Sequence, residues 1–153
     1  MNTGQRVTVI GLGYVGLPLL LEATRQGFVC TGLDIEADVV ATLNAGRSHI
    51  DDISDAELAS AVAAGLRATI DGTCLADADV AIICVPTPLD AQQTPDLRAV
   101  EAASRAIATH LHPGMLVVLE STTYPGTTDT LVRGILEQSG LRAGVDFALA
   151  FSP

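Results

Sequence analysis

The 153-residue sequence is poor in basic residues, and those present are scattered along it. Lys and Arg together number 8 against 18 Asp and Glu, which gives a formal net charge of -10. Nucleic acids and anionic membrane surfaces are bound by clustered positive charge, which this sequence does not have. We therefore expect neither a nucleic-acid partner nor a membrane partner, but a small molecule.

Cysteine pairs at metal-binding spacing are also missing. Cys30, Cys74 and Cys84 are odd in number and form no CxxC pair, so the sequence indicates neither a disulfide framework nor a zinc site. Cys30 and Cys84 fall within predicted core strands, where a thiol is usually inert, and Cys74 is expected at a helix start. This use of cysteine favours a cytoplasmic protein.

No uninterrupted apolar run is long enough to cross a membrane. The apolar stretch at 7–20 is broken by glycine and proline, has only Arg6 as a basic leader, and lacks a small-residue cleavage pattern. We expect neither a signal peptide nor a membrane span. Because 48% of the residues are apolar, residues 1–153 can form one domain around a hydrophobic core.

Strand and helix signals alternate along the whole chain. Strands joined through helices lie parallel, because a crossover of this length returns the chain to the same end of the sheet. The sequence therefore predicts a doubly wound α/β domain with helices on both faces of a parallel sheet. The predicted strands are 6–10, 28–34, 66–70, 79–85, 115–120 and 147–150; the predicted helices are 14–26, 37–46, 54–65, 97–111 and 127–139, with a loop at 86–96.

Three glycines in the first apolar run have the spacing G-x-G-x-x-G. Gly11 suits the sharp turn from strand to helix, Gly13 leaves room for a ligand to approach the backbone, and Gly16 lets the helix pack closely. The start of that helix, with N–H groups expected from Tyr14 and Val15, can bind a pyrophosphate. The pattern is typical of a Rossmann-type dinucleotide-binding domain.

Asp34 closes the second predicted strand. It follows the glycines at about the 20-residue spacing at which an acidic residue binds ribose in such domains. Its carboxylate can accept both hydroxyls of an adenosine ribose, whereas it would repel a 2′-phosphate. No arginine follows in "DIEAD" to neutralise such a phosphate, so the sequence favours NAD over NADP.

The motifs "GLGYVGLPLL", "GLDI", "AIICVPTPL", "PDL" and "ESTTYPGTT", in this order, resemble those of the nucleotide-sugar dehydrogenases, the UDP-glucose and GDP-mannose dehydrogenase family. The resemblance covers essentially the whole chain. The stretch "LNAGRSHIDDIS" is most similar to the branch that acts on UDP-N-acetylglucosamine. The resemblance implies oxidation of the C6 alcohol of a UDP-sugar to a carboxylate with two NAD, through an aldehyde and a cysteine thioester.

The resemblance also implies roles for individual residues. Thr87, in "VPTP", would contact the nicotinamide side of the cofactor, and Thr122 would lie near the nicotinamide and help to position a catalytic water. Both follow predicted strands, and each could instead be a loop hydroxyl that satisfies backbone groups. The implied cofactor-binding set is Gly11, Gly13, Tyr14, Val15, Gly16, Asp34, Thr87 and Thr122, with Thr122 also catalytic.

The chain departs from the family pattern in two respects. Many relatives carry Lys or Arg where this chain has Asp38 and Val39, so a contact on the adenosine side is missing or replaced. The family's catalytic cysteine, central helix and C-terminal substrate domain would lie beyond Pro153. We therefore expect an N-terminal piece of a longer, homo-oligomeric enzyme, a piece that binds NAD but does not turn over substrate.

The histidines and an acidic cluster have simpler interpretations. His110 and His112 lie near a predicted helix end, where imidazoles cap carbonyls. His49 lies in a predicted loop and could approach a substrate, although a solvated position is expected. The acidic residues of 51–55 lack the ligand spacing of a calcium loop and suit a solvated helix start. We expect no metal site.

Two other functions stay open from the sequence. The hydroxyacid and 6-phosphogluconate dehydrogenases share a "GLG" opening, although "VPTP" and "STTYPGT" weigh against them. A non-catalytic module that senses nicotinamide cofactors would use the same fold.

Overall fold

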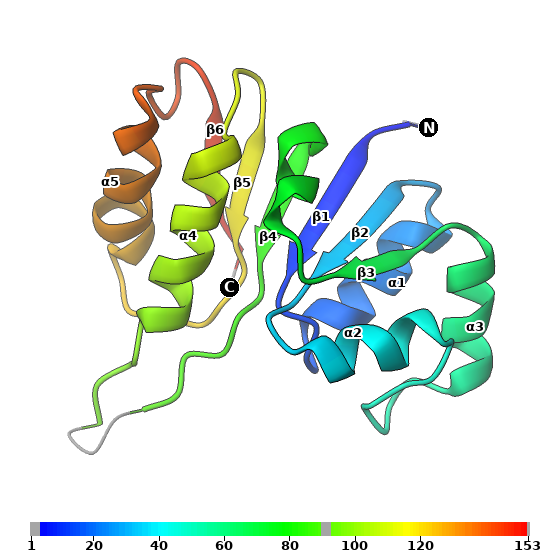
Figure 1. Ribbon diagram of the computed structural model, residues 1–153. Coiled ribbons are helices and arrows are strands. Elements are labelled where there is room, and N and C mark those ends of the chain that lie inside the picture. Colours follow the sequence, from blue (N-terminus) through cyan, green and yellow to red (C-terminus); the bar gives the residue numbers. More distant parts are fainter. Residues whose placement is uncertain (1–3, 90–92, 153) are drawn as a thin grey trace.

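A parallel six-stranded sheet organises the chain (Figure 1). The computed structural model describes residues 4–89 and 93–152, so Pro153 and part of the predicted loop at 86–96 lie outside the described residues. The strands are β1 (Arg6–Ile10), β2 (Val29–Leu33), β3 (Arg67–Thr69), β4 (Val80–Ile83), β5 (Leu116–Leu119) and β6 (Ala148–Phe151). Their order, β3-β2-β1-β4-β5-β6, and parallel pairing confirm the predicted doubly wound sheet.

Helices cover both faces of the sheet. They are α1 (Gly16–Arg25), α2 (Ala37–Asn44), α3 (Asp55–Ala63), η1 (Gly72–Asp77), α4 (Arg98–His110), η2 (Thr128–Val132), α5 (Arg133–Leu136) and η3 (Glu137–Ser139). Within residues 4–89 and 93–152, no helix has the length and apolar character needed to span a bilayer.

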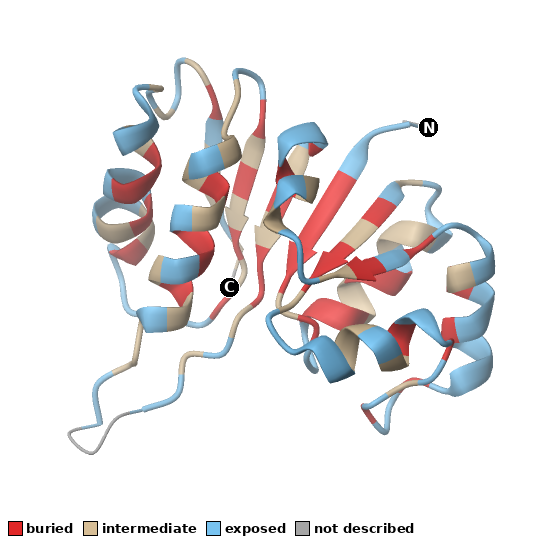
Figure 2. Cartoon of the chain, viewed as in Figure 1, coloured by how far each residue is buried: buried red, intermediate tan, exposed pale blue. Residues whose placement is uncertain are grey.

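Two hydrophobic clusters hold these layers together. One joins α1, α2 and α3 to the strands and includes the fully buried Leu17 and Leu58. The other joins η1, α4, η2 and α5 to the strands and includes Leu75, Ile107 and Leu136. Figure 2 shows the buried residues running along the strands and along the sides of the helices that face them. Burial of this apolar surface on both faces stabilises the layered fold.

The predicted elements are all present, with ends that differ by a few residues. The first helix begins at Gly16 rather than Tyr14, because Tyr14 and Val15 belong to the turn that the glycines form. The predicted helix at 127–139 consists of π-helical, α-helical and 3-10 turns in succession. Residues 72–77 form the 3-10 helix η1, where the sequence predicted only a helix start.

A capping box begins α3. The Ser54 hydroxyl oxygen accepts the Glu57 N–H at 3.3 Å, and the Glu57 carboxylate accepts the Ser54 N–H at 3.1 Å. Hydrogen bonds from Ser54, and a smaller contribution from Arg25, hold the pKa of Glu57 below its ordinary value. Free N–H groups at the helix start are thus satisfied locally, as the sequence predicts.

Replacing Ser54 with alanine removes this cap. We expect Ser54→Ala to lower the free energy of unfolding by about 1 kcal/mol, the usual cost of losing an N-cap, as measured by urea denaturation. Ser60→Ala in the exposed middle of the same helix is the matched control, and we expect no loss there because alanine favours helix. Equal stability of the two variants would contradict a stabilising cap.

Candidate functional site

A cavity of about 830 Å³ opens where the strands end. In doubly wound sheets ligands bind at this carboxyl edge, and the volume lies in the range of about 300–1,000 Å³ common for ligand pockets. Its walls come from the ends of the first five strands and from α4. The lining residues are Ile10–Val15, Leu33–Glu36, Val39, His49, Ile70, Gly72, Cys84–Thr87, Ala99, Ala102, Ala103, Ala106 and Glu120–Thr122.

The three glycines shape the middle of this cavity in different ways. Gly11 has a φ of +91°, and a Cβ there would lie 2.8 Å from the Cys84 carbonyl oxygen. A Cβ on Gly16 would lie 1.8 Å from the carbonyl oxygen of Gly11, so this turn closes only with glycine at that position. A Cβ on Gly13 would meet nothing within 4 Å. Gly11 and Gly16 are therefore required by the fold, whereas Gly13 leaves open space beside the backbone.

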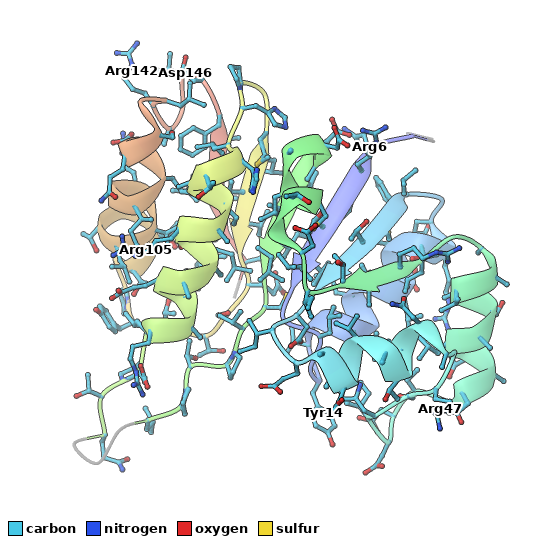
Figure 3. All side chains as sticks on the ribbon, viewed as in Figure 1. Arg6, Tyr14, Arg47, Arg105, Arg142 and Asp146 are labelled. Atoms are coloured by element: carbon cyan, nitrogen blue, oxygen red, sulfur yellow. The ribbon has the colours of Figure 1, made fainter. Side chains whose placement is uncertain are left out.

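The turn also exposes backbone donors. Within the described residues, no acceptor takes the N–H of Tyr14 or Val15, whereas the Leu17 N–H donates to the Gly13 carbonyl at 3.1 Å. Figure 3 shows the Tyr14 side chain projecting outward from the turn, at the opposite end of β1 from Arg6. The two N–H groups that the sequence singled out are thus available to an anion at the start of α1.

Asp34 holds the turn in place. One carboxylate oxygen accepts the Leu12 N–H at 2.8 Å, and the other accepts the Glu36 N–H at 3.0 Å. Leu12 is buried, so Asp34 supplies the acceptor that its N–H would otherwise lack. A carboxylate offers about four acceptor directions, so two remain for hydroxyl groups in the cavity. Asp34 therefore both supports the turn and presents a negative charge to the cavity.

A second set of hydrogen bonds joins the loops that follow β4 and β5. The Thr87 hydroxyl donates to the Thr122 carbonyl at 2.6 Å, and the buried Ser121 hydroxyl donates to the Val85 carbonyl at 2.7 Å. The Thr122 hydroxyl has no hydrogen bond within residues 4–89 and 93–152. The structure thus brings Thr87 and Thr122 together, and of their hydroxyls only that of Thr122 is free to donate.

Cys84 lies at the cavity wall rather than inside a strand, because β4 ends at Ile83. It is buried, and burial, aided by the charge of Glu120, raises the pKa of its thiol to about 12. Such a thiol stays protonated at neutral pH and is a poor nucleophile. Burial likewise raises the pKa of Cys30 and of Cys74.

The sequence did not single out several cavity residues. Glu120 and Ser121 belong to "ESTTYPGTT", from which only Thr122 was selected, and the strand end directly before them was the available signal. For His49 the sequence favoured a solvated loop over an approach to substrate; the residue is exposed and also lies on the cavity lining. Val39, at a position where the resemblance implies Lys or Arg, lines the cavity with an apolar side chain.

Other predicted positions lie elsewhere. The His112 ring contacts the carbonyls of Ala78 at 3.0 Å and Pro113 at 3.1 Å, and His110 ends α4. Asp55 accepts the Ser48 N–H at 2.7 Å, at the start of α3. In the part of the chain that the structure describes, no group of three His, Cys, Asp or Glu could hold a metal ion.

The chain is similar in sequence to known nucleotide-sugar dehydrogenases. Residues 5–153 match the sequence model of the UDP-glucose/GDP-mannose dehydrogenase family, NAD binding domain. The chain is 39% identical over 150 residues to UDP-N-acetyl-D-mannosamine dehydrogenase from Pyrococcus horikoshii. It is 40% identical over 149 residues to UDP-N-acetyl-D-glucosamine 6-dehydrogenase from Pseudomonas aeruginosa. Both alignments cover 97% of this chain but 36% and 35% of the relatives, so the chain spans about a third of their length.

Solved structures agree with the sequence matches. The structure of the Pyrococcus horikoshii UDP-D-ManNAc dehydrogenase superposes with a TM-score of 0.91 at 40% identity. A ternary complex of GDP-mannose dehydrogenase from Pseudomonas aeruginosa superposes with a TM-score of 0.92 at 31% identity. Each covers 97% of this chain and 36% of the solved chain.

The hydrogen bonds of Asp34 can be tested without any ligand. We expect Asp34→Ala to lower the free energy of unfolding by about 1–3 kcal/mol, because the buried Leu12 N–H loses its acceptor. Asp52→Ala is the control, since Asp52 is exposed and its carboxylate makes no hydrogen bond in the described part of the chain. Urea denaturation of both variants gives the comparison, and equal stability would contradict the structural role of Asp34.

Proposed function

This chain belongs to the UDP-glucose/GDP-mannose dehydrogenase family, and we propose that it is the NAD-binding part of an NAD-dependent nucleotide-sugar 6-dehydrogenase. The proposed parent enzyme oxidises the C6 alcohol of a UDP-sugar to the carboxylate. The matches to UDP-N-acetyl-D-mannosamine and UDP-N-acetyl-D-glucosamine dehydrogenases favour a UDP-N-acetylhexosamine, and the sequence favours UDP-N-acetylglucosamine. The single observation that carries the proposal is the open turn at Gly13 beside two free N–H groups.

The middle of the cavity suits the pyrophosphate of NAD. A pyrophosphate needs close access to backbone and several donors, and the turn offers both at Gly13, Tyr14 and Val15. In the proposal Gly11 and Gly16 form the turn itself. No Lys or Arg is among the described residues that line the cavity. In the proposal, the positive end of the α1 dipole and the backbone N–H groups therefore attract the pyrophosphate.

Asp34 marks the adenosine end of the proposed site. Its two remaining acceptor directions suit the two hydroxyls of an adenosine ribose. Ile35, Val39 and Ile70 line the same end and offer an apolar surface to a base. A 2′-phosphate would meet the charges of Asp34 and Glu36 with no cation to offset them, which supports NAD over NADP.

Thr87 and Thr122 mark the opposite end. In the proposal the free hydroxyl of Thr122 faces the nicotinamide and orients a water, while Thr87 fixes the Thr122 backbone through its 2.6 Å hydrogen bond. When bound there, NAD supplies the hydride acceptor for oxidation at C6. Cys84 does not fit the thioester role, because its thiol is protonated with a pKa of about 12.

Of the two other functions considered from the sequence, the family match excludes the first, and the non-catalytic module that senses nicotinamide cofactors stays an alternative. Because residues 5–153 match the nucleotide-sugar dehydrogenase family, the chain is not assigned to the hydroxyacid and 6-phosphogluconate dehydrogenases. A cytoplasmic location and assembly with further copies of the chain stay predictions.

Cofactor choice can be measured on this chain. We expect NAD to raise the melting temperature more than NADP at equal concentration, because Asp34 repels the 2′-phosphate. Asp34→Asn removes the charge but keeps one acceptor oxygen, so the two shifts should become more similar. Equal shifts on the unchanged chain would contradict the role of Asp34 in cofactor choice.

The open turn can be blocked directly. We expect Gly13→Leu to abolish the melting-temperature shift with NAD, because the side chain would occupy the space beside the free N–H groups. Without NAD its melting temperature should stay close to that of the unchanged chain, since a Cβ at Gly13 meets nothing within 4 Å. Gly134→Leu, at an equally open glycine on α5 away from the cavity lining, is the matched control and should keep the shift. A retained shift in Gly13→Leu would show that NAD does not bind at the turn.

A further inference from the structure

Glu120 is an acidic residue on the cavity lining that the proposed function leaves without a role. It directly follows β5, and its backbone N–H donates to the Ile83 carbonyl at 2.9 Å, which fixes its position. Within residues 4–89 and 93–152 its carboxylate makes no hydrogen bond and no ion pair. Structural carboxylates of this chain behave differently, since Asp34 and Glu57 each accept N–H groups.

Glu120 lies at the opposite end of the cavity from Asp34. The sheet order places β1 and β4 between β2, which Asp34 follows, and β5, which Glu120 follows. Its neighbours in the chain, Ser121 and Thr122, line the cavity beside Thr87. A dinucleotide with its adenosine at Asp34 and its pyrophosphate at Gly13 therefore extends its nicotinamide toward Glu120.

The charge of Glu120 acts on the surrounding cavity wall. Burial is the main reason that the pKa of the Cys84 thiol, at the end of β4, is raised, and the negative charge of Glu120 raises it further. The other ionisable groups on the described lining, besides the thiol and the phenol of Tyr14, are Asp34, Glu36 and His49, all from the segments that follow β2. No cation among the described lining residues offsets Glu120.

We propose that Glu120 is a specificity-determining residue that makes this site prefer oxidised over reduced cofactor. The nicotinamide ring of NAD⁺ carries a positive charge, whereas the ring of NADH is neutral. A carboxylate beside the ring therefore attracts the oxidised form alone. This inference rests on the proposed function, because it needs the nicotinamide at the Thr87 and Thr122 end.

The preference has a consequence for turnover. An enzyme that uses two NAD on one substrate must release NADH after each hydride transfer. A site that holds NADH more weakly than NAD⁺ speeds that exchange. For a partly exposed charge near the ring, we expect a contribution of about three- to tenfold in the ratio of dissociation constants.

The test compares both oxidation states on the same variants. Dissociation constants for NAD⁺ and NADH are measured by calorimetry for the unchanged chain and for Glu120→Gln, Glu120→Asp and Glu36→Gln. We expect Glu120→Gln to lower the ratio Kd(NADH)/Kd(NAD⁺) by about three- to tenfold, and Glu120→Asp to keep most of it. Glu36→Gln, at the adenosine end, should change both constants by the same factor. General damage to the loop would also weaken both forms equally and leave the ratio unchanged.

ADP-ribose, which lacks the nicotinamide, separates an effect on the ring from an effect on the site. Its affinity should be the same for Glu120→Gln and the unchanged chain. An unchanged NADH to NAD⁺ ratio in Glu120→Gln, with both forms still bound, would overturn the role of Glu120 and leave the proposed function intact. A loss of ADP-ribose affinity equal to that of NAD⁺ would also overturn it. If the unchanged chain bound neither NAD⁺ nor NADH, the proposed function would fail and this inference with it.

Discussion

The contact between Gly16 and the carbonyl of Gly11 is the constraint on which the site depends. A methyl group at position 16 would lie 1.8 Å from that oxygen. The turn between β1 and α1 therefore forms only because the backbone of residue 16 can lie directly against the carbonyl of Gly11. The closed turn leaves the N–H groups of Tyr14 and Val15 unpaired and directs the start of α1 at the cavity. Asp34 then fixes the turn through the Leu12 N–H, 22 residues away in the chain. The geometry that we propose for pyrophosphate binding is thus a product of backbone packing rather than of basic side chains.

This design explains how an acidic chain can suit an anionic cofactor. The formal net charge is -10, and the described lining of the cavity contains carboxylates but no Lys or Arg. Long-range attraction is therefore absent, and short-range hydrogen bonds from oriented N–H groups must supply the affinity. In our proposals the carboxylates then discriminate between cofactors, Asp34 at the adenosine end and Glu120 at the nicotinamide end.

Much of the fold could be predicted because its signals are local. Short apolar strands alternate with helical patterns that end at glycines, and Ser54 and Glu57 form a capping box at the expected spacing. The glycine spacing and the place of Asp34 at a strand end likewise indicate a dinucleotide site from neighbouring residues alone. The contacts made between distant segments could not be predicted. The Thr87 to Thr122 hydrogen bond joins residues 35 apart, and the place of Glu120 in the cavity depends on the pairing of β4 with β5. The motifs identify these residues, but which hydroxyl is hydrogen-bonded and which is free depends on how the ends of β4 and β5 lie side by side.

The different surroundings of Gly13 and Gly16 bear on how the chain tolerates genetic change. Substitution at Gly16 disrupts the turn itself, so the altered protein would unfold more readily and be removed by cellular proteolysis. Substitution at Gly13 disturbs no packing, so the altered protein would stay folded, resist the same proteolysis and accumulate at normal abundance. In our proposal, in which Gly13 lies beside the cofactor, the two kinds of allele therefore differ in protein level: a Gly16 variant is degraded, whereas a Gly13 variant persists as a folded chain that does not bind NAD.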